Sequence, residues 1–249
     1  MTVPAGQVLR TIEALPFGTA ADVTGGQPVL ILAPHADDES LGCGGLIAAL
    51  CRAKAPPLVL VLTDGTGSHP GSRAYPAPRL AAVREAEVRE AVRLLGLPPD
   101  RIRFAGQRDT AAPVSGPAFE AAADMVEALC QADRTGTVLA PWRHDPHCDH
   151  EAAHLLAVEV AGRLGLRQLS YPVWGWTLPA DHPLPALPRG FRLEIGADLA
   201  VKDAAIRAHR SQYGGLILDD PLGFTLPDGL LRVFGRPWEA FLHQEEDPG

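Results

Sequence analysis

Short apolar runs alternate with longer amphipathic segments along most of this chain. The apolar runs predict strands at 28–33, 58–63, 102–105, 137–140 and 167–170, and a further strand near 191–199. The amphipathic segments predict helices at 39–54, 79–95, 117–132, 149–164 and 201–210, with an initial helix near 5–15. Hydrophobic strands that alternate with helices are typical of a mostly parallel sheet with helices on both faces. The pattern therefore predicts an α/β fold of the Rossmann-like kind.

Two irregular segments interrupt the alternation. Residues 65–78 are rich in Gly, Ser and Pro and predict a loop at the edge of the sheet where ligands bind, and residues 179–189 are rich in Pro. We find no internal repeat and no low-complexity tract, and 249 residues suit one domain. We therefore expect a single domain over residues 1–249.

Composition narrows the class of protein. Hydrophobic residues make up 46% and charged residues 21%, as in an ordinary globular protein with a buried core. The formal net charge is −8 and no basic patch is present, which argues against nucleic acid as a partner. No apolar run approaches the roughly 20 residues that span a bilayer, and residues 1–26 lack the basic and apolar regions of a signal peptide. We expect no membrane partner and a cytoplasmic location, and we make no prediction of oligomeric state.

The first candidate site follows the apolar run 29–33 and reads Pro34-His35-Ala36-Asp37-Asp38-Glu39. Ligands in open α/β sheets bind beyond the carboxyl ends of the strands, where this segment is expected to lie. Three adjacent acidic side chains repel one another unless a positive charge lies among them. With a histidine beside them, a divalent metal is the natural partner.

The second candidate site follows the apolar run 138–140. Residues 144–154 contain four of the nine histidines of the chain and two aspartates, in the order His144-Asp145-Pro146-His147-Cys148-Asp149-His150-Glu151-Ala152-Ala153-His154. A catalytic zinc ion typically has three protein ligands and one open position. His35, Asp38 and one histidine of this cluster would complete such a set.

Together the two segments resemble the PIG-L/LmbE-like family of zinc-dependent N-acetylglucosaminyl deacetylases. That family has a P/A-H-P-D-D-E motif after its first core strand and an H-P-D-H motif after a later strand. Ala36 and Cys148 replace the two motif prolines here, and neither position is a ligand. The resemblance covers about residues 25–215, including Arg84 on a predicted helix and the late segment 202–212.

The resemblance implies a role for each motif residue. The implied zinc ligands are His35, Asp38 and His150, although another divalent metal would use the same ligands. The implied catalytic residues are Asp37 as general base, His147 as the group that stabilises the oxyanion and protonates the leaving amine, and Asp149 as the residue that orients His147. Arg84 matches a family arginine near the substrate, although its helix is equally compatible with a surface ion pair.

The implied reaction is hydrolysis of a linear amide. Zinc makes water a better nucleophile and an amide carbonyl a better electrophile, and a carboxylate and an imidazole can move the protons. The substrate implied by the resemblance is an N-acylated amino sugar conjugate or a related small metabolite, with acetyl as the expected acyl group.

Two alternative motifs are present. His150-Glu151-Ala152-Ala153-His154 spells H-E-x-x-H, the signature of zinc metallopeptidases. However, Pro146 places His150 near the start of its helix, and this alternative leaves residues 34–39 unexplained. The run Gly42-Cys43-Gly44-Gly45 weakly resembles a dinucleotide loop, but its spacing is not G-x-G-x-x-G and the adjacent acids would repel a pyrophosphate.

The remaining chemically versatile residues receive structural interpretations. The four cysteines, Cys43, Cys51, Cys130 and Cys148, show no disulfide or metal-binding spacing. We expect His209 to be structural, and His154 to face solvent or to support His150. Trp174 and Trp176 are expected either to pack in the core or to line a sugar site.

Overall fold

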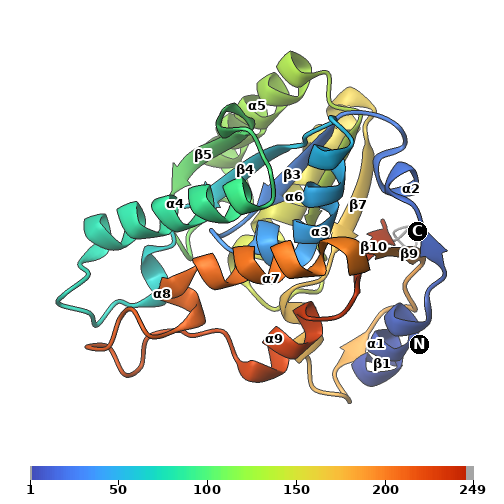
Figure 1. Ribbon diagram of the computed structural model, residues 1–249. Coiled ribbons are helices and arrows are strands. Elements are labelled where there is room, and N and C mark those ends of the chain that lie inside the picture. Colours follow the sequence, from blue (N-terminus) through green and yellow to red (C-terminus); the bar gives the residue numbers. More distant parts are fainter. Residues whose placement is uncertain (1, 245–249) are drawn as a thin grey trace.

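The computed structural model describes residues 2–244 and contains a mixed sheet of eight strands with helices on both faces (Figure 1). The strands of this sheet are β2 (Phe17–Gly18), β3 (Val29–Ala33), β4 (Leu58–Thr63), β5 (Ile102–Gln107), β6 (Thr137–Pro141), β7 (Arg167–Tyr171), β9 (Gly190–Glu194) and β10 (Trp238–His243). Their order is β2-β9-β10-β7-β6-β3-β4-β5. A separate antiparallel pair is formed by β1 (Val3–Pro4) and β8 (Pro183–Leu184).

The direction of the strands defines where a ligand site can form. Strands β3 to β7 are all parallel, whereas β10 runs antiparallel to both β7 and β9. From β3 the chain proceeds to β4 and β5 on one side, and then returns to β6 and β7 on the other side. The switch in direction therefore lies between β3 and β6, and the crevice beyond their carboxyl ends is the expected ligand site.

Helices cover both faces of the sheet. The α-helices are α1 (Ala5–Ala14), α2 (Ala20–Thr24), α3 (Asp38–Arg52), α4 (Ala77–Leu94), α5 (Gly116–Asp133), α6 (Cys148–Leu164), α7 (Leu199–Ala208), α8 (Arg210–Tyr213) and α9 (Asp228–Phe234). Short 3-10 helices are η1 (Thr66–Ser68), η2 (Pro99–Arg101), η3 (Trp174–Thr177) and η4 (Gly196–Asp198). Helices α3, α4 and α7 lie in front of the sheet in Figure 1, and α5 and α6 contribute to the core on the opposite face.

The central strand β3 is buried on both faces, which explains its uninterrupted apolar run. Ile31 and Ala33 pack in the cluster that includes α3, α4 and α7. Leu30 and Leu32 pack in the cluster that includes α5 and α6. Because successive side chains of a strand point to opposite faces, one run of five residues contributes to both cores.

The glycines of α3 serve helix packing. A Cβ atom on Gly42 would lie 2.2 Å from Cδ2 of Tyr171, and one on Gly45 would lie 2.4 Å from Cγ2 of Ile195. These residues let α3 approach β7 and the end of β9 more closely than any larger residue would. The close approach explains the glycine run without a nucleotide.

The predicted strands and helices agree with the structure over most of the chain, and the α/β fold is confirmed. The strand expected near 191–199 was wrong in its second half, because it ends at Glu194 and η4 leads into α7. The final helix α9 and strand β10 were not predicted. In β10 the apolar pattern is broken by Glu239, whose Oε1 atom lies 2.7 Å from Nζ of Lys202 in a fully buried ion pair.

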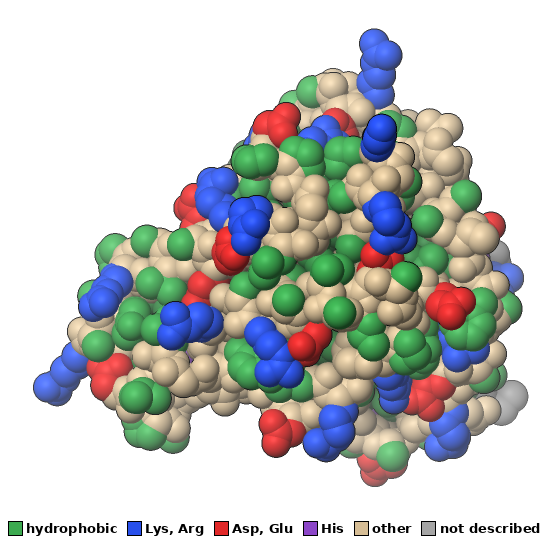
Figure 2. All heavy atoms as spheres, in the orientation of Figure 1, with side chains coloured by type: hydrophobic (Ala, Val, Ile, Leu, Met, Phe, Trp, Pro, Cys, Tyr) green, Lys and Arg blue, Asp and Glu red, His purple; other side chains and the backbone are tan. Residues whose placement is uncertain are grey.

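Other predictions concern the surface and the organisation of the chain. No helix within residues 2–244 is long and apolar enough to cross a membrane. Figure 2 shows acidic and basic side chains interspersed over one face of the molecule. The division of the chain into a single domain stays a prediction.

Candidate metal centre and active site

The loops that follow β3 and β6 meet at one cavity beyond the carboxyl ends of these strands. The cavity has a volume of about 310 Å³. Its floor is formed by His35, Asp37 and Asp38 from the first loop and by His147 from the second. The structure thus brings the two sequence motifs together at the switch point of the sheet, as parallel neighbouring strands require.

The three predicted metal ligands converge on one atom. The Oδ2 atom of Asp38 lies 3.2 Å from Nδ1 of His35 and 3.3 Å from Nε2 of His150. All three side chains are buried. Two imidazoles and a carboxylate grouped in this way are a ligand set that zinc accepts.

The ring nitrogen of His150 that faces Asp38 also fits a metal. The Nε2 atom of His150 is buried and makes no hydrogen bond within the described residues. Its polar neighbour is Oδ2 of Asp38 at 3.3 Å, a contact that is not a hydrogen bond, and a cation beside these two atoms would satisfy both of them. The ligand atoms of His35, His147 and His150 also lie within 4.8 Å of one another. The donor set and the unpaired nitrogen both favour a divalent metal here.

Carboxylates fix the opposite nitrogen of each ligand histidine. Nδ1 of His150 lies 2.9 Å from Oδ2 of Asp145, and Nε2 of His35 lies 3.2 Å from Oδ2 of Asp149. A carboxylate behind a ligand histidine sets the ring orientation and increases its basicity. Each ring therefore directs its remaining nitrogen toward Asp38.

Proton affinities in the metal-free protein follow from these contacts. Burial alone would lower the pKa of His150, but Asp38 and Asp145 outweigh it and raise the pKa to about 9. Burial would also lower the pKa of His35. However, the neighbouring carboxylates of Asp109, Asp149 and Asp38 outweigh burial and raise this pKa well above its ordinary value. Without a metal, protons therefore supply the positive charge that this group of acids requires.

Asp145 is a residue whose role the sequence did not reveal. Besides His150, its carboxylate accepts hydrogen bonds from the backbone N–H groups of Val173, Trp174 and Gly175, at 2.7–3.0 Å. This buried acid joins a predicted metal ligand, His150, to the segment after β7, whose Trp174 lines the cavity. The only sequence signal is its place in an Asp-Pro turn beside the predicted ligands.

The predicted general base, Asp37, lies at the cavity in an unusual backbone conformation. Its φ angle is 154°, and holding a non-glycine residue in such a region costs about 1–3 kcal/mol. Burial raises the pKa of Asp37 to about 6, against the opposing charge of Arg84. A carboxylate with this pKa suits proton transfer near neutral pH.

The predicted orientation of His147 by the Asp149 carboxylate was wrong. That carboxylate is turned toward His35 and accepts backbone N–H bonds from Thr110 and Ala112. Instead, the backbone N–H of Asp149 donates to Nδ1 of His147 at 3.2 Å, because His147 caps the first turn of α6. A neutral His147 therefore carries its proton on Nε2.

The proton affinity of His147 bears on its implied role as the group that protonates the leaving amine. Burial, together with the charges of His35 and His150, lowers its pKa to about 4 in the metal-free protein. Asp149 raises the pKa of His147 by less than these effects lower it. The structure thus favours a neutral imidazole that donates a hydrogen bond from Nε2.

Asp109 is a buried acid of the cavity that sequence reasoning missed. Its Oδ1 atom lies 3.3 Å from Nε2 of His35, and its Oδ2 atom accepts the backbone N–H of Gly67. Burial would raise the pKa of Asp109, but the contact with His35 outweighs burial and lowers this pKa. The Asp109 carboxylate is therefore ionised. It follows β5 without any motif, and its position just beyond a strand end was the only available signal.

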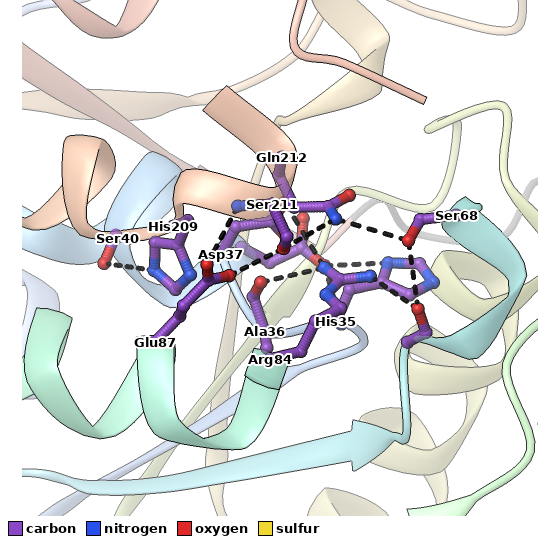
Figure 3. A network of polar contacts seen from close by, with 12 residues as sticks. His35, Ala36, Asp37, Ser40, Ser68, Arg84, Glu87, His209, Ser211 and Gln212 are labelled. Atoms are coloured by element: carbon purple, nitrogen blue, oxygen red, sulfur yellow. Dashed lines mark hydrogen bonds and ion pairs between the residues drawn. The ribbon is translucent and has the colours of Figure 1, made fainter. Parts of the chain in front are cut away.

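Arg84 lies inside the molecule, and the surface ion pair considered as an alternative was wrong. It is 4% exposed and its guanidinium donates to the carbonyl oxygens of Gly65 and Ala36, at 3.1 and 2.8 Å. Its Nη2 atom lies 3.5 Å from Oδ2 of Asp37 (Figure 3). Arg84 lines the cavity, and it also braces the loop that holds the predicted base.

The outer wall of the cavity is apolar. Trp174 and Phe224 make an edge-to-face contact with ring centroids 5.4 Å apart, and Leu41 and Leu226 extend this wall. Gln212 lies at the same cavity, and its amide donates to the hydroxyl oxygens of Ser68 and Ser211 (Figure 3). Phe224 belongs to no motif, and Gln212 ends the late segment 202–212 of the family resemblance, to which no site role was assigned.

The H-E-x-x-H alternative is not supported by the geometry. Glu151 is exposed on α6, and Nδ1 of His154 donates to the carbonyl oxygen of Pro141 at 3.1 Å. His154 therefore stabilises the start of α6 against the end of β6. Only His150 of this segment reaches the predicted metal ligands.

Comparison with known proteins agrees with this geometry. The family model for GlcNAc-PI de-N-acetylase, PIG-L, matches residues 30–161. A diacetylchitobiose deacetylase of Thermococcus kodakarensis is 29% identical over 196 residues, which are 74% of this chain and 70% of that protein. A 1D-myo-inositol 2-acetamido-2-deoxy-alpha-D-glucopyranoside deacetylase of Saccharomonospora viridis is 29% identical over 244 residues, covering 81% of this chain and 90% of that protein.

Similarity extends to solved structures. The N,N′-diacetylchitobiose deacetylase of Pyrococcus horikoshii has the same fold, with a TM-score of 0.64 over 94% of this chain and 88% of that one. The identity of the two sequences is 22%, so this match concerns the fold.

Proposed function

Because this chain belongs to the PIG-L family and is an N-deacetylase, we propose that it uses zinc to remove an acetyl group from an amino sugar conjugate or a related small metabolite. The observation that carries the proposal is the convergence of His35 and His150 on one oxygen of Asp38, at 3.2 and 3.3 Å. The unpaired Nε2 atom of His150 lies in the same place.

Zinc at these ligands would supply Lewis acidity toward water and toward an amide carbonyl. Asp37 is the proposed general base and takes a proton from the attacking water. The carboxylic acid formed in that step can then return the proton to the leaving amine. His147 donates a hydrogen bond from Nε2 to the carbonyl oxygen as negative charge develops there.

This assignment changes the role first implied for His147. A neutral imidazole whose Nδ1 accepts the N–H of Asp149 is a good hydrogen-bond donor and a poor acid. One carboxylate, Asp37, can perform both proton transfers in turn. His147 then contributes by stabilising charge, and Asp149 and Asp145 contribute by holding the ligand histidines.

The walls of the cavity support a sugar as substrate. The aromatic wall of Trp174 and Phe224 can pack on the apolar face of a pyranose ring, and Ser68, Asp109 and Thr110 offer polar groups to its hydroxyls. Pockets for small molecules generally combine apolar walls with a few placed polar groups. Arg84 is proposed as a substrate contact at the same cavity.

A substrate panel tests the proposal. Acetate release would be measured from N-acetylglucosamine, N,N′-diacetylchitobiose, an N-acetylglucosaminyl inositol and N-acetylmethionine, with zinc-loaded and chelator-treated protein. We expect release from at least one sugar, loss of release on chelation and recovery with zinc. Zinc-independent release, or cleavage of a casein peptide without release from any sugar, would contradict the proposal.

A further inference from the structure

The backbone of Asp37 differs from every other positive-φ residue with a side chain in the part of the chain that the structure describes. Lys54, Thr110 and Arg134 have φ angles of 54–64°, in the ordinary left-handed region, whereas Asp37 has a φ angle of 154°. Such a conformation persists only where the surrounding contacts enforce it. The contacts that hold Asp37 therefore decide where its carboxylate lies.

The first turn of α3 fixes the backbone carbonyl group of Asp37 by hydrogen bonds. Its carbonyl oxygen accepts the N–H groups of Ser40 and Leu41, at 3.0 and 2.9 Å. The N–H side is held by a side chain two residues later. The N–H of Asp37 donates to Oε2 of Glu39 at 3.0 Å, in addition to a bond of 3.1 Å to the carbonyl oxygen of His35.

Glu39 is itself fixed by a residue far along the chain. Its other oxygen, Oε1, accepts from Nε2 of His209 at 3.0 Å and from the hydroxyl of Ser40 at 2.6 Å. Glu39 and His209 are 0% and 1% exposed. The Nδ1 atom of His209 makes no hydrogen bond within residues 2–244, so the polar contacts of this ring are directed at Glu39 and Ser40.

We propose that Glu39 and His209 are positioning residues that hold the backbone of Asp37 so that its carboxylate reaches the substrate; this rests on the proposed role of Asp37 as the base. His209 lies between α7 and α8, and Figure 3 shows its ring directed toward Ser40, with Asp37 nearby. The docking of the C-terminal helices on α3 thus becomes part of the catalytic geometry. Neither residue touches the cavity itself.

A second buried ion pair, Glu239 with Lys202, contacts α3 from outside that helix and provides a control. The carboxylate of Glu239 accepts the N–H groups of Gly45 and Leu46 in α3, at 2.6 and 2.9 Å, and pairs with Lys202. Glu239 is 3% exposed, which matches Glu39 in burial. Both acids therefore attach α3 to the C-terminal part of the chain, but only Glu39 contacts Asp37.

The experiment compares Glu39→Met, Glu39→Gln and Glu239→Met in zinc-loaded protein with N,N′-diacetylchitobiose. A displacement of about 1 Å in a reacting group can cost about 10²-fold in rate, so we expect Glu39→Met to lower kcat by about 10- to 100-fold with little change in KM. Glu39→Gln should recover most of that loss, because its amide oxygen still accepts the N–H of Asp37. Glu239→Met should lower Tm and leave kcat within about threefold of the parent.

A double variant separates positioning from stability. If Glu39 acts through Asp37, Glu39→Met should add less than about twofold to the loss caused by Asp37→Asn. If the kcat losses of Glu39→Met and Asp37→Asn multiply in the double variant, Glu39 does not act through Asp37. That result would overturn the positioning role and leave Asp37 as the base. Unchanged activity in Asp37→Asn would instead remove Asp37 from the mechanism, and with it both proposals.

Two further measurements keep the proposal open to refutation if Glu39→Met does not fold. His209→Gln retains a donor near the position of Nε2 and should keep most of kcat, whereas His209→Leu should behave like Glu39→Met. Amide hydrogen exchange in a peptide covering residues 33–41 needs no substrate. Exchange should be faster in His209→Leu than in the parent and unchanged in Glu239→Met; equal exchange in all three proteins would overturn the proposal.

Discussion

The loop after β3 and the loop after β6 contain the same types of residue in opposite arrangements. In the first loop the carboxylates of Asp37 and Asp38 line the cavity. In the second loop His147 lines the cavity, and the carboxylates of Asp145 and Asp149 lie behind the ligand histidines. A histidine beside aspartates therefore does not say which residue performs the chemistry and which one supports it.

The backbone explains the difference between the two loops. Asp37 has a φ angle of 154° directly before α3, and the two consecutive aspartates make different contacts: Asp37 lies beside Arg84, and Asp38 lies beside His35 and His150. In the second loop the chain enters α6 in the ordinary way, with His147 as the N-terminal cap. His147 then lines the cavity, and His150, three residues later, directs Nε2 toward Asp38 beneath it, while Asp149 points toward the loop at Thr110 and Ala112.

The largest expected effect comes from removing a ligand from either loop. His35→Ala and His150→Ala should each weaken zinc binding by more than about 100-fold, beyond the range of roughly 10- to 100-fold that is typical of residues that only orient a ligand. Zinc content after dialysis, measured by atomic emission, checks this. His154→Ala is the matched control on α6 and should retain its zinc. Full zinc content in both ligand variants would exclude the proposed ligand set.

His147 tests whether the second loop contributes charge stabilisation. His147→Ala should lower kcat by about 10²- to 10³-fold, as expected for loss of one oxyanion donor, with KM changed less and zinc retained. His147→Gln, which keeps an N–H donor, should recover part of kcat. Steady-state kinetics with a released-acetate assay measure both values. An alanine variant with the kcat of the parent would leave Arg84 as the next candidate.

Asp145 and Asp149 test whether the acids of the second loop are supports. Asp145→Asn and Asp149→Asn should each weaken zinc binding by about 10- to 100-fold. At saturating zinc, Asp149→Asn should retain most of kcat, because the backbone N–H that fixes His147 is unchanged. If Asp149→Asn at saturating zinc loses as much kcat as His147→Ala, the original interpretation, in which its carboxylate orients His147, is correct.

The sequence predicted the position of the site more fully than its internal roles. Strand ends and family motifs were enough to bring His35, Asp38 and His150 together, because parallel neighbouring strands deliver their loops to the same edge. Asp109 and Phe224 also lie at the cavity, but nothing in the adjacent residues distinguishes them from surface residues. Their positions depend on tertiary packing between segments that are distant from both motifs in the sequence.

The errors have a common physical origin. The role of Asp149 was taken from the family resemblance, and the alternative surface ion pair of Arg84 from the pattern of its helix, whereas side-chain direction depends on the first turn of α6 and on the burial of Arg84 in α4. Strand β10 was missed because Glu239 interrupts its apolar pattern, and its partner Lys202 lies on helix α7. Buried ion pairs of this kind cannot be inferred from local hydropathy.

A further prediction concerns the pH dependence of zinc binding. The pKa of His150 is about 9 in the metal-free protein, so the ring is protonated at pH 7 and must lose that proton when a metal binds. Zinc affinity should therefore rise about tenfold per pH unit for each such histidine below its pKa, and should level off above about pH 9. Calorimetry at pH 7 in two buffers of different ionisation enthalpy should show release of at least one proton per zinc ion. Binding without proton release would mean that His150 is neutral before zinc binds.

The most direct test of the account compares Asp37→Asn with Glu151→Gln in zinc-loaded protein on the best substrate of the panel. The account predicts that Asp37→Asn retains zinc and loses about 10²- to 10⁴-fold in kcat, as expected for removal of a general base. The exposed Glu151 should be replaceable with less than about twofold change in kcat. The opposite result, a crippled Glu151→Gln and an active Asp37→Asn, would contradict the account and assign the chemistry to the H-E-x-x-H segment of α6.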